Sequence, residues 1–162
     1  MGKKAFAEAK IYGEAVELAS SADKTFSYIP DCSDLDIPED LDYVYICENN
    51  TIYGTKYKTL PNTKGHILVS DVSSCFLSEP MDVTKYGVVY GGVQKNIGPA
   101  GVVIAIIRED LKQMTFFQEL LQCLSGRHRR MQILFIIHHH ATISISVARC
   151  SSGLRRWVDF QQ

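Results

Sequence analysis

The stretch that decides the fold is residues 90–103, YGGVQKNIGPAGVV. Lys95 lies near its centre and is followed by a glycine- and proline-containing turn at residues 98–101. The apolar runs on either side, residues 87–90 and 102–107, are typical of buried strands. The pattern therefore places one amine at the edge of a sheet, on a loop where the backbone can approach a ligand closely.

Lys95 is a candidate for forming a Schiff base with a carbonyl compound. Desolvation disfavours the charged form of an ammonium group and so frees the nucleophilic amine. The position of Lys95 between an apolar strand and a turn predicts such desolvation. The alternative is a loop lysine whose amine stays in water, as most lysine amines do.

The composition is that of an ordinary soluble globular protein. Of the 162 residues, 46% are apolar and 22% are charged, and the formal net charge is −1. This balance gives no reason to expect binding to nucleic acid or to a membrane. The five cysteines form no C-x-x-C pair, so no metal site and no disulfide framework are predicted. The first residues lack the apolar segment of a signal peptide, and a cytoplasmic location is expected.

Short strands that alternate with helical segments predict an α/β sheet. Apolar runs favour strands at residues 43–47, 67–70, 87–90 and 102–107. The spacing of apolar residues predicts an amphipathic helix at residues 3–20, and a short helical or turn segment is expected at residues 81–86. Ligands on such sheets bind beyond the strand ends, where Thr51, Asp71 and Lys95 are expected to lie.

Four strings carry a resemblance to a known family: KKAFAEAKIYG, DYVYICENNTIYG, ILVSDVSS and FLSEPMDVTKYGVVYGGVQKNIGPAGVVIAIIREDL. Residues 5–111, approximately, resemble the middle of the phosphoserine aminotransferase family, whose members are class V, fold-type I enzymes dependent on pyridoxal phosphate. The string QKNIGPAG is specific and argues against other class V enzymes, such as alanine–glyoxylate aminotransferases or cysteine desulfurases. The implied fold is a fragment of the α/β large domain that binds pyridoxal phosphate, with a mostly parallel sheet and flanking helices.

Asp71 is a second candidate site residue. A carboxylate directly after an apolar strand is costly unless it is paired with a cation. The alternative is a helix N-cap or turn aspartate, because Ser73 and Ser74 follow it. The resemblance assigns the aspartate of this SDVSS-like motif to the pyridine nitrogen of the cofactor, which it keeps protonated.

The resemblance alone supplies two further cofactor-binding residues. Thr51 matches a threonine that hydrogen-bonds at the cofactor ring, and Gln94 matches a residue that binds the cofactor phosphate. Without the family, Thr51 is interpreted as a turn hydroxyl and Gln94 as a surface amide. Lys95 matches the lysine that holds the cofactor, and its released amine is implied to act as the general base.

The implied activity is a transamination in serine biosynthesis. Glutamate and 3-phosphohydroxypyruvate are the implied substrates, and 2-oxoglutarate and O-phosphoserine are the products. The family's enzymes are homodimers in which a YNTPP motif reaches the partner subunit's cofactor phosphate. The family also has a substantial section before KKAFAEAKIYG, so this sequence is expected to start inside a domain.

A change in charge and sequence divides the chain near residue 111. Residues 1–111 contain 10 Lys and Arg against 16 Asp and Glu, whereas residues 112–162 contain 7 against 2. Residues 1–111 are assigned to a partial aminotransferase large domain. Residues 112–162 are assigned to a tail outside the family that is expected to be poorly ordered or irregular.

The tail is predicted to come from a frameshift, either real or introduced in gene modelling. Reading from the third base of the Lys112 codon, with degenerate codons chosen freely, permits TDD, VLPGTPTM and DSFYNTPPC in one alternative frame. The histidines at 138–140 overlie proline codons of that frame, and the basic run at 126–130 lies in the same tail. Both are therefore interpreted as accidental composition rather than as a metal site or a nucleic-acid patch.

Two functions of different classes remain open at this point. The first is a phosphoserine aminotransferase-like enzyme, represented by a central fragment of its large domain. The second is a truncated, non-catalytic product that at most binds the cofactor weakly or pairs with full-length subunits.

Overall fold

The structure is a computed structural model that describes residues 2–113, 132–139, 142–148 and 157–160. The chain divides into two compact units, Met1–Ser70 and Asp71–Gln162. Among the described residues, no helix combines the length and the apolar character needed to cross a bilayer.

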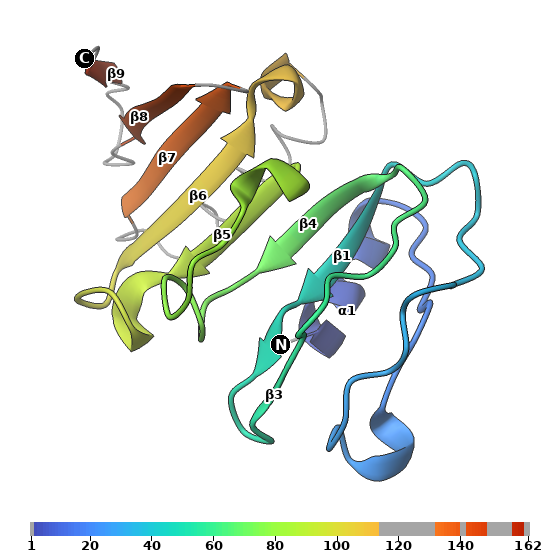
Figure 1. Cartoon of the computed structure of the whole chain (residues 1–162). Helices are drawn as coiled ribbons and strands as arrows, with labels where there is room; N and C mark the ends of the chain where they lie inside the picture. Colours follow the sequence, from blue (N-terminus) through green and yellow to red (C-terminus); the bar gives the residue numbers. More distant parts are fainter. Residues whose placement is uncertain (1, 114–131, 140–141, 149–156, 161–162) are drawn as a thin grey trace. The chain divides into compact units, whose positions relative to one another are not determined.

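Unit 1 contains a helix, a parallel strand pair and a small hairpin (Figure 1). Its elements are α1 (Gly2–Tyr12), the 3-10 helix η1 (Ala22–Lys24), β1 (Tyr43–Cys47), β2 (Asn49–Asn50), β3 (Thr55–Lys56) and β4 (Ile67–Asp71). β1 and β4 are sheet neighbours and point in the same direction in Figure 1. β2 and β3 pair antiparallel, with Asn49 opposite Lys56. Val44, Ile46, Leu68 and Val69 form the buried part of the strand pair.

The helix predicted at residues 3–20 is wrong in length. α1 ends at Tyr12, and the Gly13 N–H bonds to the Ala9 carbonyl at 3.1 Å as its last helical turn closes. Glycine is a poor helix residue, which explains why the helix stops there. No residue of α1 is buried, and Val16, inside the predicted helix but beyond α1, is 58% exposed.

The described part of unit 2 contains strands and short 3-10 helices. Its elements are η2 (Val83–Lys85), β5 (Val88–Gly92), η3 (Val93–Lys95), β6 (Val102–Arg108), η4 (Glu109–Gln113), β7 (Gln132–His139), β8 (Thr142–Ala148) and β9 (Trp157–Phe160). The Asp82 carboxylate caps η2 by accepting a bond from the Thr84 N–H. The expected short helical or turn segment at residues 81–86 is thereby confirmed, as a 3-10 helix at Val83–Lys85.

The predicted α/β class is confirmed, and the sheet of unit 2 is mixed. β6 and β7 pair parallel, as the class leads one to expect, with Val102 opposite Gln132. β5 and β6 pair antiparallel because the short connection of residues 93–101 makes them a hairpin. β8 pairs antiparallel with both β7 and β9.

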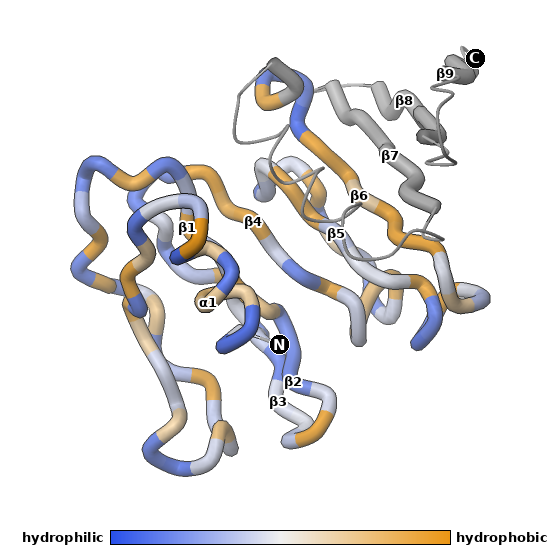
Figure 2. Tube along the Cα trace, turned by 180° about the vertical axis from the view of Figure 1, so that it is seen from behind, coloured by the Kyte–Doolittle hydropathy of each residue, from blue (hydrophilic) through white to orange (hydrophobic). Residues whose placement is uncertain are grey.

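The buried face of the hairpin forms the centre of unit 2. Along β6, Val103, Ala105 and Ile107 are buried while their neighbours are half-buried, as strand alternation requires. β6 is hydrophobic along most of its length in Figure 2. Val88 and Val89 of β5 are completely buried. This apolar centre fixes the hairpin on which Lys95 lies.

The predicted strands agree with the observed ones to within two residues at each end, and β1 agrees at both ends. In residues 112–162, for which an irregular tail is predicted, the described parts include β7, β8 and β9. β7 contains the apolar run of residues 133–137. The basic run at 126–130 and His140 lie outside the described residues.

Candidate functional site

Asp71 is buried at the end of β4, where only 4% of the residue is exposed. Its Oδ1 accepts two hydrogen bonds from Ser73, one from the backbone N–H at 2.9 Å and one from the hydroxyl at 2.5 Å. These local bonds are those of a turn aspartate, the alternative that the sequence offers. A turn aspartate does not need to be buried, however, and burying a carboxylate costs free energy. The burial therefore keeps Asp71 as a site candidate.

Ser73 connects Asp71 to the second strand of the site. Its Oγ also accepts a hydrogen bond from the Gly92 N–H at 3.2 Å. One residue earlier, the Val72 N–H donates to the Tyr90 carbonyl at 2.8 Å. The loop after β4 is thus bonded to the end of β5 through both backbone and side chain.

Gly91 allows this loop to lie close to β5. A side-chain carbon built on Gly91 would come within 3.1 Å of the backbone N and Cα of Ser73 and of the Phe76 ring. Such contacts are tighter than ordinary packing, so a larger residue at this position would push its neighbours away by a few tenths of an ångström.

Lys95 is the last residue of η3, and its Nζ donates a hydrogen bond to Ser74 Oγ at 2.6 Å. The next residue, Asn96, donates from Nδ2 to the Phe76 carbonyl at 2.7 Å. The structure therefore brings Asp71 and Lys95 into one cluster of contacts, linked through Ser73 and Ser74.

The desolvation predicted for Lys95 is wrong for this chain. Lys95 is exposed, and so are the turn residues 96–100 that follow it. The physical reason is local: η3 is a single turn that ends at Lys95, and the buried residue of that turn is Val93 rather than the lysine.

Gln94 is exposed and lies over the end of β5. A side-chain carbon on Gly92 would come within 2.5 Å of the Gln94 amide oxygen, so the amide occupies the space that the glycine leaves. This places a polar side chain next to Lys95, in the same 3-10 turn.

Thr51 belongs to unit 1, so the structure does not group it with the other three predicted residues. It is exposed in the turn between β2 and β3. Asn50 shapes that turn: its carbonyl accepts the Gly54 N–H at 2.9 Å, and its Oδ1 accepts the Ile52 N–H at 3.2 Å. The turn position agrees with the interpretation of Thr51 as a turn hydroxyl.

Sequence reasoning did not assign a functional role to Ser73, Ser74 or Asn96. The two serines were visible as possible partners of Asp71, but their bonds to Gly92 and Lys95 span 19 and 21 residues. No local spacing rule predicts pairs so far apart in the sequence. The available signal was the polar run that follows a buried strand.

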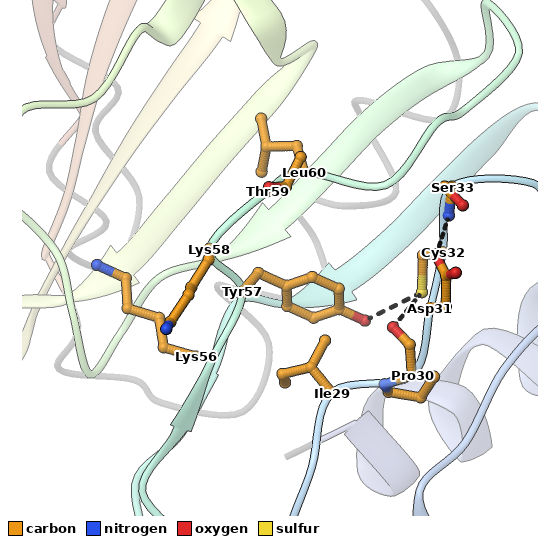
Figure 3. Close-up of a pocket in the computed structure, with 10 residues that line it drawn as sticks. All are labelled: Ile29, Pro30, Asp31, Cys32, Ser33, Lys56, Tyr57, Lys58, Thr59 and Leu60. Atoms are coloured by element: carbon orange, nitrogen blue, oxygen red, sulfur yellow. Dashed lines mark hydrogen bonds between the residues drawn. The ribbon is translucent and has the colours of Figure 1, made fainter.

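A pocket of about 360 Å³ lies in unit 1 and contains none of the four predicted site residues (Figure 3). Figure 3 shows the Tyr57 ring reaching toward Cys32, and the Tyr57 hydroxyl lies 3.8 Å from Cys32 Sγ. Cys32 Sγ also donates to the Pro30 carbonyl at 3.4 Å. Burial, assisted by Cys32, raises the pKa of Tyr57 above its ordinary value of 10.0. The contacts of this pocket are those of a packed phenol and thiol.

Comparisons with known proteins agree with the resemblance seen in the sequence. The family model for "Aminotransferase class-V" matches residues 12–128. The phosphoserine aminotransferase of Lysinibacillus sphaericus (strain C3-41) is 50% identical over 109 residues, which are 67% of this chain and 30% of that protein. This chain therefore spans about 30% of the length of that curated relative.

Two solved structures match the fold. A phosphoserine aminotransferase studied for radiation damage of its Schiff base matches with a TM-score of 0.66 and 38% identity, covering 76% of this chain and 36% of that one. The phosphoserine aminotransferase of Trichomonas vaginalis, with pyridoxal phosphate bound, matches with a TM-score of 0.55 and 31% identity, covering 64% of this chain and 31% of that one.

Proposed function

Because the chain belongs to the aminotransferase class-V family, we propose that it represents the central part of a phosphoserine aminotransferase that depends on pyridoxal phosphate. The proposed reaction transfers the amino group of glutamate to 3-phosphohydroxypyruvate, giving 2-oxoglutarate and O-phosphoserine for serine biosynthesis. The observation that carries the proposal is the 50% identity to the Lysinibacillus enzyme over 109 residues. Those residues amount to 67% of this chain, so the likeness extends well beyond a single motif.

The chemistry of the side chains in unit 2 fits this cofactor. It needs an amine for its aldehyde and an anion for its pyridine nitrogen. Lys95 and the buried Asp71 supply these two groups, and Ser73 and Ser74 connect them to neighbouring backbone and side chains. When bound, pyridoxal phosphate supplies an electron-withdrawing ring that takes up the electron pair left when a proton leaves Cα.

Each proposed residue has a defined role in cofactor binding or proton transfer. The Lys95 amine binds the cofactor and, once released by the amino-acid substrate, accepts the proton from the substrate Cα. The Asp71 carboxylate holds a proton on the pyridine nitrogen by charge attraction. Thr51 hydrogen-bonds at the cofactor ring, and Gln94 binds the cofactor phosphate. These roles are carried over from the family to the matching positions of this sequence.

The test is covalent labelling at Lys95. The purified chain is mixed with pyridoxal phosphate, reduced with borohydride and mapped by peptide mass spectrometry. The expected result is one reduced adduct on Lys95, lost in Lys95→Arg and kept in Lys85→Arg, a matched change at the end of η2. Adducts spread over Lys3, Lys56 and Lys64 at similar yield would overturn the assignment.

A second candidate function is a non-catalytic chain that at most binds the cofactor weakly or pairs with full-length subunits. The exposure of Lys95 favours it, because a Schiff-base lysine is activated by desolvation. The two candidates differ in turnover. A labelled chain that forms no O-phosphoserine from glutamate and 3-phosphohydroxypyruvate supports the second, and steady formation of the product excludes it.

We also propose the division into a partial large domain at residues 1–111 and a frameshift-derived tail at residues 112–162. The readable YNTPP in the alternative frame supports it. Sequencing of the transcript tests it, and a transcript without that alternative frame contradicts the frameshift. The proposed assembly is a homodimer, as in the family, and the proposed location is the cytoplasm.

A further inference from the structure

Ser73 has more bonds than a turn serine needs. Its N–H and its hydroxyl both donate to Asp71 Oδ1, and the same hydroxyl oxygen accepts the Gly92 N–H. Its hydroxyl thus touches both the buried carboxylate and the backbone immediately before η3.

The chain contains a second copy of the local pattern for comparison. Asp82 and Thr84 form the same pair of bonds, with the Thr84 N–H at 3.1 Å and its hydroxyl at 2.6 Å from Asp82 Oδ1. That pair is exposed and caps η2. The pair of Asp71 and Ser73 differs in two respects, the burial of the carboxylate and the bond to Gly92.

These two differences bear on the position of the carboxylate. Because two donors hold Asp71 Oδ1, the orientation of the carboxylate plane is fixed. Asp71 Oδ2 takes part in neither of these two hydrogen bonds. Hydrogen bonds to a charged group are roughly twice as strong as neutral ones, which makes this an effective clamp. Because Gly92 is bonded to the same hydroxyl, the clamp also sets the carboxylate relative to the turn that carries Lys95.

We infer that Ser73 is a positioning residue of the cofactor site, whose hydroxyl orients the Asp71 carboxylate and ties it to the Lys95 turn through the Gly92 N–H. The inference rests on the proposed function, since the carboxylate is positioned for the pyridine nitrogen of pyridoxal phosphate. Ser73 itself touches neither the cofactor nor the substrate in this role.

The experiment compares four forms of the full chain: wild type, Ser73→Ala, Ser73→Thr and Thr84→Ala. Two properties are measured with pyridoxal phosphate bound, its dissociation constant and the pH midpoint of its long-wavelength absorbance. A third, the hydrogen-exchange rate of the Gly92 amide, is measured without cofactor. Thr84→Ala removes the matched hydroxyl outside the site and serves as the control.

Ser73→Ala is expected to weaken binding of pyridoxal phosphate about tenfold, the size expected when one hydrogen bond to a charged group is lost. It is also expected to move the absorbance midpoint to higher pH, because a misplaced carboxylate holds less positive charge on the pyridine nitrogen. Exchange at Gly92 is expected to become faster. Ser73→Thr keeps a hydroxyl at this position, as Thr84 does in the matched pair, and is expected to have the same pH midpoint of absorbance as the wild type.

A Ser73→Ala chain that matches Thr84→Ala in all three measurements overturns the inference while the proposed function stands. The inference also fails if Gly92 exchange rises but the midpoint does not move, since the role of the hydroxyl is then purely structural. A wild-type chain without the Lys95 adduct overturns the proposed function, and the inference with it. If Ser73→Ala does not fold, Ser73→Thr decides the question. A pH midpoint of absorbance equal to that of the wild type supports the inference, and a shifted midpoint overturns it.

Discussion

A single absent side chain lets the loop after β4 approach β5. Gly91 faces the Ser73 backbone and the Phe76 ring, and a methyl group at Gly91 would lie 3.1 Å from both, closer than ordinary van der Waals contact. The neighbours on the Ser73 side are backbone atoms, which cannot rotate away as the end of a flexible side chain can. At the scale of single residues, the geometry of the candidate site depends on the small size of Gly91 as much as on the polar groups that bond to one another.

Gly91→Ala is therefore expected to destabilise the chain by about 1–3 kcal/mol, the usual cost of overpacking. It is also expected to separate Ser73 from Gly92, so that pyridoxal phosphate binds less tightly. Urea unfolding and a cofactor titration measure the two effects. Gly13→Ala, which meets no atom within 4 Å, is the control, and equal losses in both variants would contradict the expectation.

Tyr57 gives a pH dependence to the stability. Burial raises the pKa of its phenol above 10.0 in the folded protein, so the unfolded chain loses the proton first. The contribution of Tyr57 is therefore complete below about pH 10 and falls as the pH rises toward the folded pKa. Tyr57→Phe is expected to flatten the fall in urea midpoint above pH 10. Tyr53→Phe, in an exposed turn, is the control, and an unchanged slope in Tyr57→Phe would refute the argument.

At the scale of elements, the sequence predicts where the strands lie, but it does not predict where the helix ends. Apolar runs such as YVYIC and VVIAIIR have one reasonable structure, and β1 and β6 form there. The helical spacing of residues 3–20 continues past Gly13, but the helix ends at Tyr12. A helix is stabilised mainly by packing of its apolar face, and the spacing of apolar residues does not show whether a partner for that face exists. Sequence patterns located Asp71 and Lys95, whereas their links through Ser73 and Ser74 arise only when distant elements meet.

The end of η1 stores strain that a substitution can release. Thr25 follows η1 with a φ of 55°, in the left-handed region that a β-branched residue rarely adopts. Thr25→Gly is expected to stabilise the chain by about 1 kcal/mol, because glycine adopts this region without the steric cost. Thermal unfolding measures the gain. Lys24→Gly, within η1 itself, is expected to destabilise, and stabilisation by both would show that strain is not the cause.

At the scale of the whole molecule, the boundary predicted from the sequence differs from the boundary between the two compact units. The charge changes sign near residue 111, whereas the compact units divide at Ser70 and Asp71. The family match extends to residue 128, past the predicted boundary. The charge boundary reflects the composition of the sequence, whereas the compact units reflect which backbone segments pack together, so the two boundaries need not agree.

Restoring the alternative frame after Leu111 is expected to strengthen binding of pyridoxal phosphate by at least about tenfold, the effect of one or two added phosphate contacts. The physical reason is the YNTPP segment, which in the family reaches the partner subunit's cofactor phosphate. A cofactor titration and a sedimentation measurement follow binding and dimer formation. A chain of equal length with the restored segment scrambled is the control, and equal affinity of the two chains would count against the frameshift proposal.

The hairpin of β5 and β6 has a consequence for insertions and deletions. Lys95 lies on its connection, and the two strands are held in register from Val88 opposite Ile107 to Gly92 opposite Val103. Side chains alternate between faces along a strand, so removing one residue from the connection can be absorbed by a slip that keeps the strands paired but turns one of them over. Insertions or deletions in this connection are therefore expected to abolish the pyridoxal phosphate adduct on Lys95 while leaving the secondary structure intact. Such chains would pass a test of folding and fail the test of labelling at Lys95.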